Sequence, residues 1–152
     1  MNRIKAFTLG LLLGTAFLST GALAEDDPKI MVYKSPTCGC CSKWVTHLKE
    51  NGFDVETTDL NDLRMIKSMS GIKPEQASCH TAKVGGYVIE GHVPADDIKR
   101  LLAESPEARG LILPGMPKGS PGMEVAGFDS EPFDVVTFDK SGNTEVFASY
   151  TP

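Results

Sequence analysis

The chain has 152 residues, which is enough for one ordinary domain with its own core, and it carries 20 acidic against 15 basic side chains for a formal net charge of −5. This acidic balance argues against nucleic acids and anionic membrane surfaces as partners.

Residues 1–24 have the pattern of a secretory signal peptide. Arg3 and Lys5 form a basic start, residues 6–17 are mostly apolar, and Ala22-Leu23-Ala24 supplies small residues at the cleavage position. We therefore expect one domain, residues 25–152, in the periplasm and without membrane attachment after cleavage. Loss of Arg3 and Lys5 would take the net charge from −5 to −7. The alternative is an uncleaved anchor, although the apolar stretch is short for a membrane span.

Hydrophobic periodicity and turn residues predict alternating strands and helices in the rest of the chain. Residues 105–127 show little hydrophobic periodicity, so no helix or strand is predicted there. In the helix predicted at 59–70, Met65 and Met69 are expected on the apolar stripe that faces the core. The predicted strands are 29–34, 53–57, 83–93, 133–138 and 144–150, and the predicted helices are 43–51, 59–70 and 94–104.

A C-x-x-C pair lies at the first strand-to-helix junction of this pattern, between Cys38 and Cys41. A C-x-x-C motif in a βαβ unit is typical of a thioredoxin-like fold. The sequence therefore predicts an α/β, thioredoxin-like domain with a mixed central sheet flanked by helices and a C-terminal β-hairpin.

Cys40 adds a third thiol inside this pair, which a simple structural cross-link does not need. A helix N-terminus lowers the pKa of a thiol and favours both sulfur exchange and metal ligation. Adjacent cysteines bridge only with strain, so the extra thiol is better explained as a soft-metal ligand or a resolving thiol. The alternative is a structural Cys38–Cys41 disulfide with Cys40 buried and inert.

Two further segments carry soft donors. Cys79 and His80 are expected near the cysteine turn, where a thiolate beside an imidazole suits Cu(I) or Zn(II); alternatively, Cys79 is disulfide-bonded to a turn cysteine and His80 lies at the surface. Met116 and Met123 lie in a Pro/Gly-rich loop, either as thioether ligands for Cu(I) or as caps of an irregular core. His92 is expected to be structural, and His47 to face solvent.

Four segments resemble the periplasmic copper-resistance protein CopG family, long catalogued as a domain of unknown function. The resemblance covers about residues 30–150 and is carried by SPTCGCCSKW, SCHTA, GYVIEGHVPADDI and LPGMPKGSPGME. It implies a thioredoxin-like fold, a periplasmic location and copper bound at the cysteine turn. The ligands it implies are Cys38, Cys40, Cys41 and Cys79, with His80 and Met116 or Met123 as additions.

The function expected from these residues is periplasmic copper resistance, with Cu(I) held in a cysteine-thiolate site that can contain several ions. The Cys38/Cys41 pair could exchange electrons with copper as Cu(I) and Cu(II) interconvert, and other periplasmic copper-handling or redox proteins would be partners. One alternative is a thiol–disulfide oxidoreductase that uses Cys38 and Cys41 alone. Another is a zinc-stabilised module, which usually spaces its ligands as two separated pairs.

Overall fold

The computed structural model describes residues 28–152, so the expected signal peptide, residues 1–24, lies outside the described residues. One seven-stranded mixed sheet runs through the domain in the order β2-β1-β3-β4-β5-β6-β7. Its strands are β1 Ile30–Lys34, β2 Val55–Asp59, β3 Thr81–Val84, β4 Tyr87–Glu90, β5 Gly110–Ile112, β6 Phe133–Phe138 and β7 Thr144–Tyr150.

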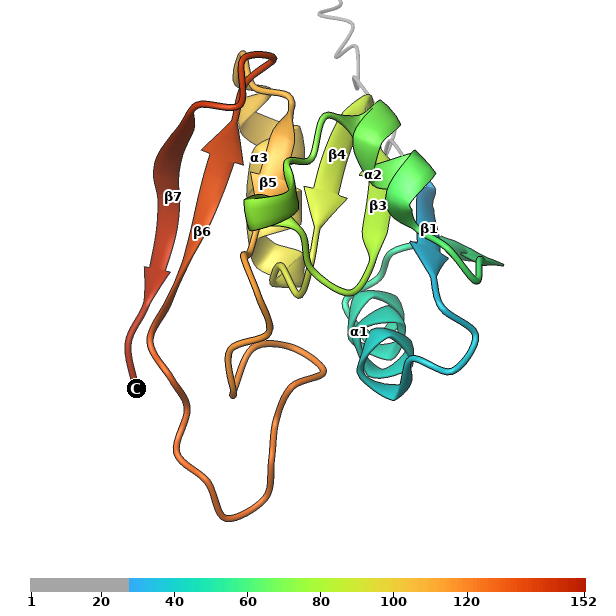
Figure 1. Ribbon diagram of the computed structural model, residues 1–152. Coiled ribbons are helices and arrows are strands. Elements are labelled where there is room, and N and C mark those ends of the chain that lie inside the picture. The colour runs from blue at the N-terminus through green and yellow to red at the C-terminus, as the bar shows by residue number, and fades with distance from the viewer. Residues whose placement is uncertain (1–27) are drawn as a thin grey trace, which may run out of the picture.

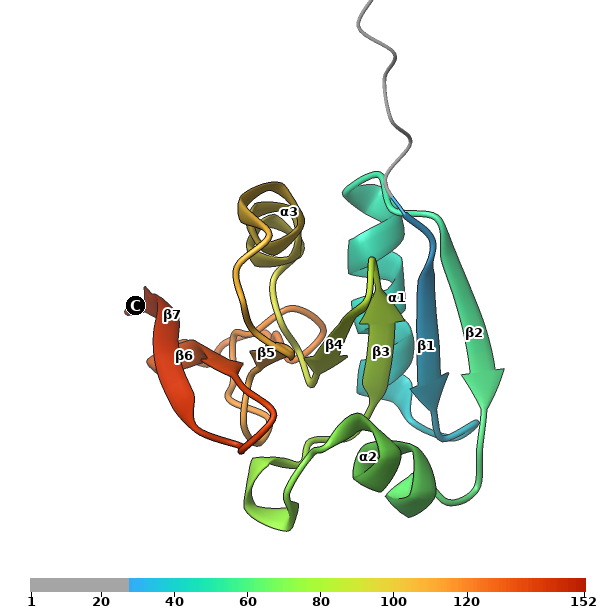
Figure 2. The same ribbon diagram turned by 90° about the horizontal axis from the view of Figure 1, so that it is seen from above.

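Three helices cover the sheet: α1 Gly39–Glu50, α2 Arg64–Ser70 and α3 Ala95–Glu104, with a short 3₁₀ turn at Pro74–Gln76. Viewed from above, α1 and α3 lie on one face of the sheet and α2 on the other (Figures 1 and 2). Along β4, Ile89 belongs to the core under α1 and α3, whereas Val88 belongs to a smaller cluster on the opposite face. This alternation is what a strand buried on both faces requires.

The α/β class, the mixed sheet and the C-terminal hairpin are confirmed, and the arrangement is compatible with a thioredoxin-like fold. β1 and β2 pair in parallel across α1, and β6 and β7 form an antiparallel pair. The bounds of β6 and β7 are those expected. Asp139 closes their turn, because its carboxylate accepts hydrogen bonds from the backbone N–H groups of Ser141 and Asn143.

Several predicted boundaries are wrong. α1 begins at Gly39 rather than 43, so two cysteines fall within its first turn. The run 83–93 is two short strands joined at Gly85-Gly86, and its first strand begins at Thr81. Residues 105–127 include the three-residue strand β5, which is too short to show periodicity.

The predicted apolar stripe on the second helix is also wrong. α2 covers only residues 64–70, and Met65 and Met69 are 76% and 67% exposed. Instead, the ammonium of Lys67 reaches the sheet and contacts Glu90 and Thr81. Among residues 28–152, no helix is both long and apolar enough to cross a membrane.

Candidate metal centre

The cysteine turn lies between the end of β1 and the first turn of α1. Cys38 caps the helix, and its Sγ accepts a hydrogen bond from the N–H of Cys41 at 3.3 Å. Cys38 and Cys41 form a disulfide, as one alternative reading of the sequence expected. Cys40 is neither bonded nor fully buried, and its Sγ is 3.5 Å from Cys38 Sγ. This exposure contradicts the part of that alternative in which Cys40 is buried.

Cys79 approaches the turn from the segment that enters β3. It is a free, half-buried thiol, so the expected alternative of a disulfide to the turn does not occur in this structure. The Sγ atoms of Cys38, Cys40, Cys41 and Cys79 all lie within 4.8 Å of one another. Two segments that are 38 residues apart in the sequence therefore supply a compact group of four sulfur atoms.

A second group of donors shares Cys79. Its Sγ lies 3.0 Å from Nε2 of His92 and 3.3 Å from Nδ1 of His80. Nδ1 of His92 donates to the carbonyl oxygen of Pro121 at 2.8 Å, so in the neutral ring Nε2 carries the lone pair and faces the sulfur. Metal-binding histidines are held in the same way by a carbonyl behind the ring.

His80 and His92 are both fully buried, which contradicts the expectation of a surface position for His80. The His80 ring packs on Trp44 with the centroids 4.3 Å apart and the planes tilted by 35°, and its Nε2 has no hydrogen-bond partner among the described residues. Sequence reasoning expected His92 to be structural and so missed its contact with Cys79.

Burial keeps this second group neutral in the absence of a cation. It is the main cause that raises the pKa of the Cys79 thiol to about 12, with the neighbouring Cys40 adding to the effect. Burial also lowers the pKa of His80 and of His92. A soft cation would reverse this preference at the sulfur, because metal ligation requires the thiolate and releases its proton.

His47 is partly buried rather than solvent-facing, and it belongs to neither group. Its Nε2 accepts the N–H of Ala95, the first residue of α3, at 3.1 Å. The imidazole thus satisfies one of the open N–H groups at that helix end. Burial lowers the pKa of His47, which keeps the ring in the neutral form that can accept this bond.

The Pro/Gly-rich loop packs over both groups. Gly115 accepts a hydrogen bond from Ser78 beside Cys79, and Pro121 holds His92. Met116 follows Gly115, and Met123 lies two residues after Pro121; Met116 is half exposed, and Met123 is partly buried. The loop therefore lies beside the cysteines as a ligand role requires, and both thioethers remain predicted donors.

Gly122 is the close contact between this loop and α1, and we expect Gly122→Ala to be costly. A Cβ there would lie 2.8 Å from both the Cys40 carbonyl oxygen and the Trp44 nitrogen. Gly115→Ala is the matched control, because φ is also positive there, +70° against +85°, but nothing lies within 4 Å. The control should cost about 1–2 kcal/mol for the left-handed backbone, and Gly122→Ala about 1–3 kcal/mol more for the crowding.

The free energy of unfolding in denaturant measures this difference. Equal losses for the two variants would show that the loop does not press on the first turn of α1.

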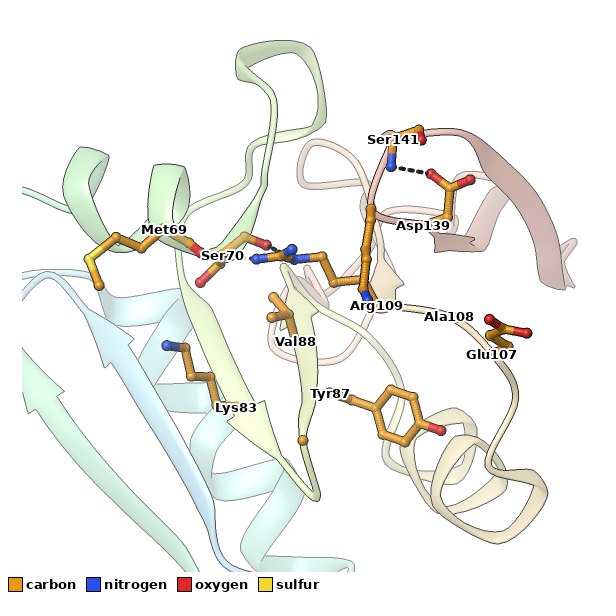
Figure 3. Close-up of a pocket in the computed structure, with 12 residues that line it drawn as sticks. Met69, Ser70, Lys83, Tyr87, Val88, Glu107, Ala108, Arg109, Asp139 and Ser141 are labelled. Atoms are coloured by element: carbon orange, nitrogen blue, oxygen red, sulfur yellow. Dashed lines mark hydrogen bonds between the residues drawn. The ribbon is translucent and has the colours of Figure 1, made fainter.

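A separate groove lies away from the cysteine turn. It encloses about 840 Å³ between α2, the β3–β4 hairpin and the β6–β7 turn. Arg109 hydrogen-bonds to Ser70 across its upper part, and Asp139 binds Ser141 at its rim (Figure 3). The described residues that line it include no cysteine or histidine, so the metal-binding groups are not in this cavity.

Comparisons with known proteins agree with this site. A family model described as a protein of unknown function, DUF411, matches residues 76–123, which contain Cys79, His80, His92 and the loop. A search of curated protein sequences gave no match.

Two solved structures resemble the chain over most of its length. "Copper resistance protein copG- Form 1" is 40% identical, with a TM-score of 0.77, over 83% of this chain and 99% of that chain. "Copper resistance protein copG- Form 2" is 41% identical, with a TM-score of 0.77, over 82% and 99%. With this identity and coverage, and with a four-cysteine group that could hold a metal ion, the chain belongs to the CopG family of copper resistance proteins.

Proposed function

We propose that this protein acts in copper resistance by holding Cu(I) in a thiolate site made of Cys38, Cys40, Cys41 and Cys79. The observation that carries the proposal is the convergence of four sulfur atoms within 4.8 Å from two separate segments. Soft thiolates prefer Cu(I) to hard cations. A shared set of sulfurs also allows bridged ions, so the site can hold more than one copper.

Further donors surround the four sulfurs. His80 and His92 reach the group through Cys79, and Met116 and Met123 lie in the loop that covers it. We include His80 and the two thioethers as additional ligands. The mixture of thiolate, imidazole and thioether donors suits copper in both oxidation states, since imidazole also binds Cu(II).

The disulfide gives the site a redox function in this proposal, with copper as substrate. Reduction of the Cys38–Cys41 bond takes up two electrons and two protons, which balances the oxidation of two Cu(I) ions to Cu(II). The reverse reaction would oxidise the dithiol and reduce two Cu(II) ions. Either direction makes the protein a copper oxidoreductase, with Cys38 and Cys41 as the redox pair.

The proposed setting is the periplasm, reached through a signal peptide at residues 1–24, with residues 25–152 as one copper-binding domain. An oxidising compartment supports the disulfide. The proposed partners are copper ions and other periplasmic copper-handling or redox proteins, without nucleic acid and without a membrane anchor after cleavage.

Anaerobic titration of the fully reduced protein with Cu(I) and a competing chelator tests the ligand set. Cys40→Ser should lower the number of bound ions and weaken binding, because it removes the thiol that plain disulfide exchange does not need. Ser42→Ala on the same turn is the control, because within residues 28–152 the Ser42 hydroxyl makes one hydrogen bond, to the Cys38 carbonyl. Unchanged stoichiometry and affinity in Cys40→Ser would contradict the proposal.

The runner-up function is thiol–disulfide exchange with protein cysteines. The Cys38–Cys41 disulfide at the start of α1 favours it. That function needs neither Cys79 nor the methionines. An insulin-reduction assay separates the two functions, since full turnover by Cys79→Ser would favour disulfide exchange.

A further inference from the structure

A fully buried carboxylate lies next to the segment that carries Cys79. Glu90 ends β4, opposite Thr81 in the strand pairing, and its side chain has no exposed surface. Its Oε1 accepts from the Lys67 ammonium and, at 2.7 Å, from the backbone N–H of Ser78. Its Oε2 accepts from the Thr81 hydroxyl at 2.7 Å. Both oxygens are therefore engaged, and one of these bonds is to the residue just before Cys79.

The partner of this carboxylate is equally unusual. The Lys67 side chain is 14% exposed and comes from α2, whose two methionines face solvent. Buried ion pairs add little to stability compared with apolar side chains of the same size. α2 thus turns a lysine toward the sheet while Met65 and Met69 stay exposed, so it gives up apolar packing for a charged contact at this point.

The contact between Lys67 and Glu90 fixes the position of residues 78–80, which carry Cys79. Regular pairing of β3 with β4 stops at Thr81 and Glu90, so residues 78–80 lie outside the ladder. Besides the contacts of the Cys79 Sγ with His80 and His92, backbone groups or hydroxyls of these residues make three bonds: Ser78 N–H to Glu90, Ser78 hydroxyl to the Gly115 carbonyl, and Gly91 N–H to the His80 carbonyl. Of these three, only the bond from the Ser78 N–H is accepted by a buried charged side chain, that of Glu90. Glu90 is in turn bound by Lys67 of α2.

We propose that the buried Lys67–Glu90 pair is a positioning device that holds Cys79 against the cysteine turn through the Ser78 N–H. The proposal rests on the copper function proposed above and assigns that site two positioning residues. Neither is a ligand: Glu90 positions Ser78 through its Oε1, and Lys67 neutralises the buried charge of Glu90, which a glutamine at position 90 would not carry. Outer partners of metal ligands commonly change metal affinity 10- to 100-fold when they are removed.

Two double variants separate the hydrogen bond from the charge. In Lys67→Met/Glu90→Gln, the amide oxygen can still accept the Ser78 N–H, and the amide nitrogen can donate to the Thr81 hydroxyl. In Lys67→Met/Glu90→Met, the pair is replaced by apolar side chains of similar length, and the Ser78 N–H loses its acceptor. Both variants avoid an unpaired buried charge, so each should fold, as circular dichroism and a melting curve will verify.

Anaerobic Cu(I) competition and iodoacetamide labelling of the metal-free protein are the two readouts. In the labelling, mass spectrometry compares the alkylation rate of Cys79 with that of Cys40. The glutamine variant should match wild type in both. The methionine variant should bind Cu(I) about 10- to 100-fold more weakly, and its Cys79 should be alkylated severalfold faster relative to Cys40.

Wild-type behaviour of the methionine variant overturns the proposal, and so does a loss in the glutamine variant as large as that in the methionine variant. If the methionine variant does not fold, Lys67→Leu/Glu90→Leu, which also removes the acceptor of the Ser78 N–H, replaces it in both readouts with the same expected losses. If wild type binds Cu(I) no better than Cys40→Ser, the copper function fails. The labelling rates then still decide the positioning role.

Discussion

Protein with the Cys38–Cys41 disulfide intact should bind Cu(I) at least about 100-fold more weakly than the fully reduced protein. The disulfide removes two of the four sulfurs as thiolates and leaves Cys40 and Cys79. Loss of an outer partner alone weakens metal sites 10- to 100-fold, so loss of two direct ligands should exceed that range. Competition titrations of both forms measure the difference, after a thiol count has verified two free thiols against four.

The double variant Cys38→Ser/Cys41→Ser gives the matched control. It should bind Cu(I) as weakly as the oxidised protein, whether or not reductant is present. Wild-type protein should regain its affinity on reduction, because the same residues become available again. Equal affinity of oxidised and reduced wild type would place the copper ligands outside the redox pair and leave only Cys40, Cys79 and the surrounding donors.

The parts of the fold that the sequence predicts well are those with clear local signals. The hairpin at 133–150 has two alternating strands around Asp139, and both strands lie where expected. The parallel β1–β2 pair follows from the strand, helix and strand pattern around the cysteines. α2 ends at the expected residue, but it begins at Arg64 rather than 59, and Lys67 faces the sheet while Met65 and Met69 are exposed. A charged residue is normally assigned to the solvent side, so the sequence pattern did not indicate this face.

The candidate site divides in the same way. The cysteine turn can be found from the spacing of its cysteines alone. The contact of His92 with Cys79 follows only from the register of β3 against β4. Gly85-Gly86 joins β3 to β4, and Val84 pairs with Tyr87. Continued to the open end of the hairpin, that register places Cys79 opposite His92. Placing the hairpin turn at Gly85-Gly86, rather than at Glu90-Gly91, would have predicted the contact between Cys79 and His92. The proposed role of Glu90 could not be predicted from the sequence, because it depends on how α2 packs on the sheet.

Trp44→Ala should be strongly destabilising, at about 3–5 kcal/mol. Trp44 is fully buried, its Nε1 donates to the Val93 carbonyl at 2.8 Å, and its ring supports His80. Truncation therefore leaves a cavity, an unpaired carbonyl and an unsupported imidazole. Denaturant unfolding measures the loss of stability, and Cu(I) competition under folding conditions measures the effect on the site.

Phe53→Ala distinguishes general destabilisation from damage to the site. Phe53 belongs to the same core cluster and is 4% exposed, so its truncation should also cost about 3–5 kcal/mol. It follows the end of α1, whereas the cysteines lie at the start of that helix. Only Trp44→Ala should weaken Cu(I) binding, because only Trp44 packs on a residue that contacts Cys79. Equal copper affinity in the two variants would mean that the position of His80 does not matter to the metal.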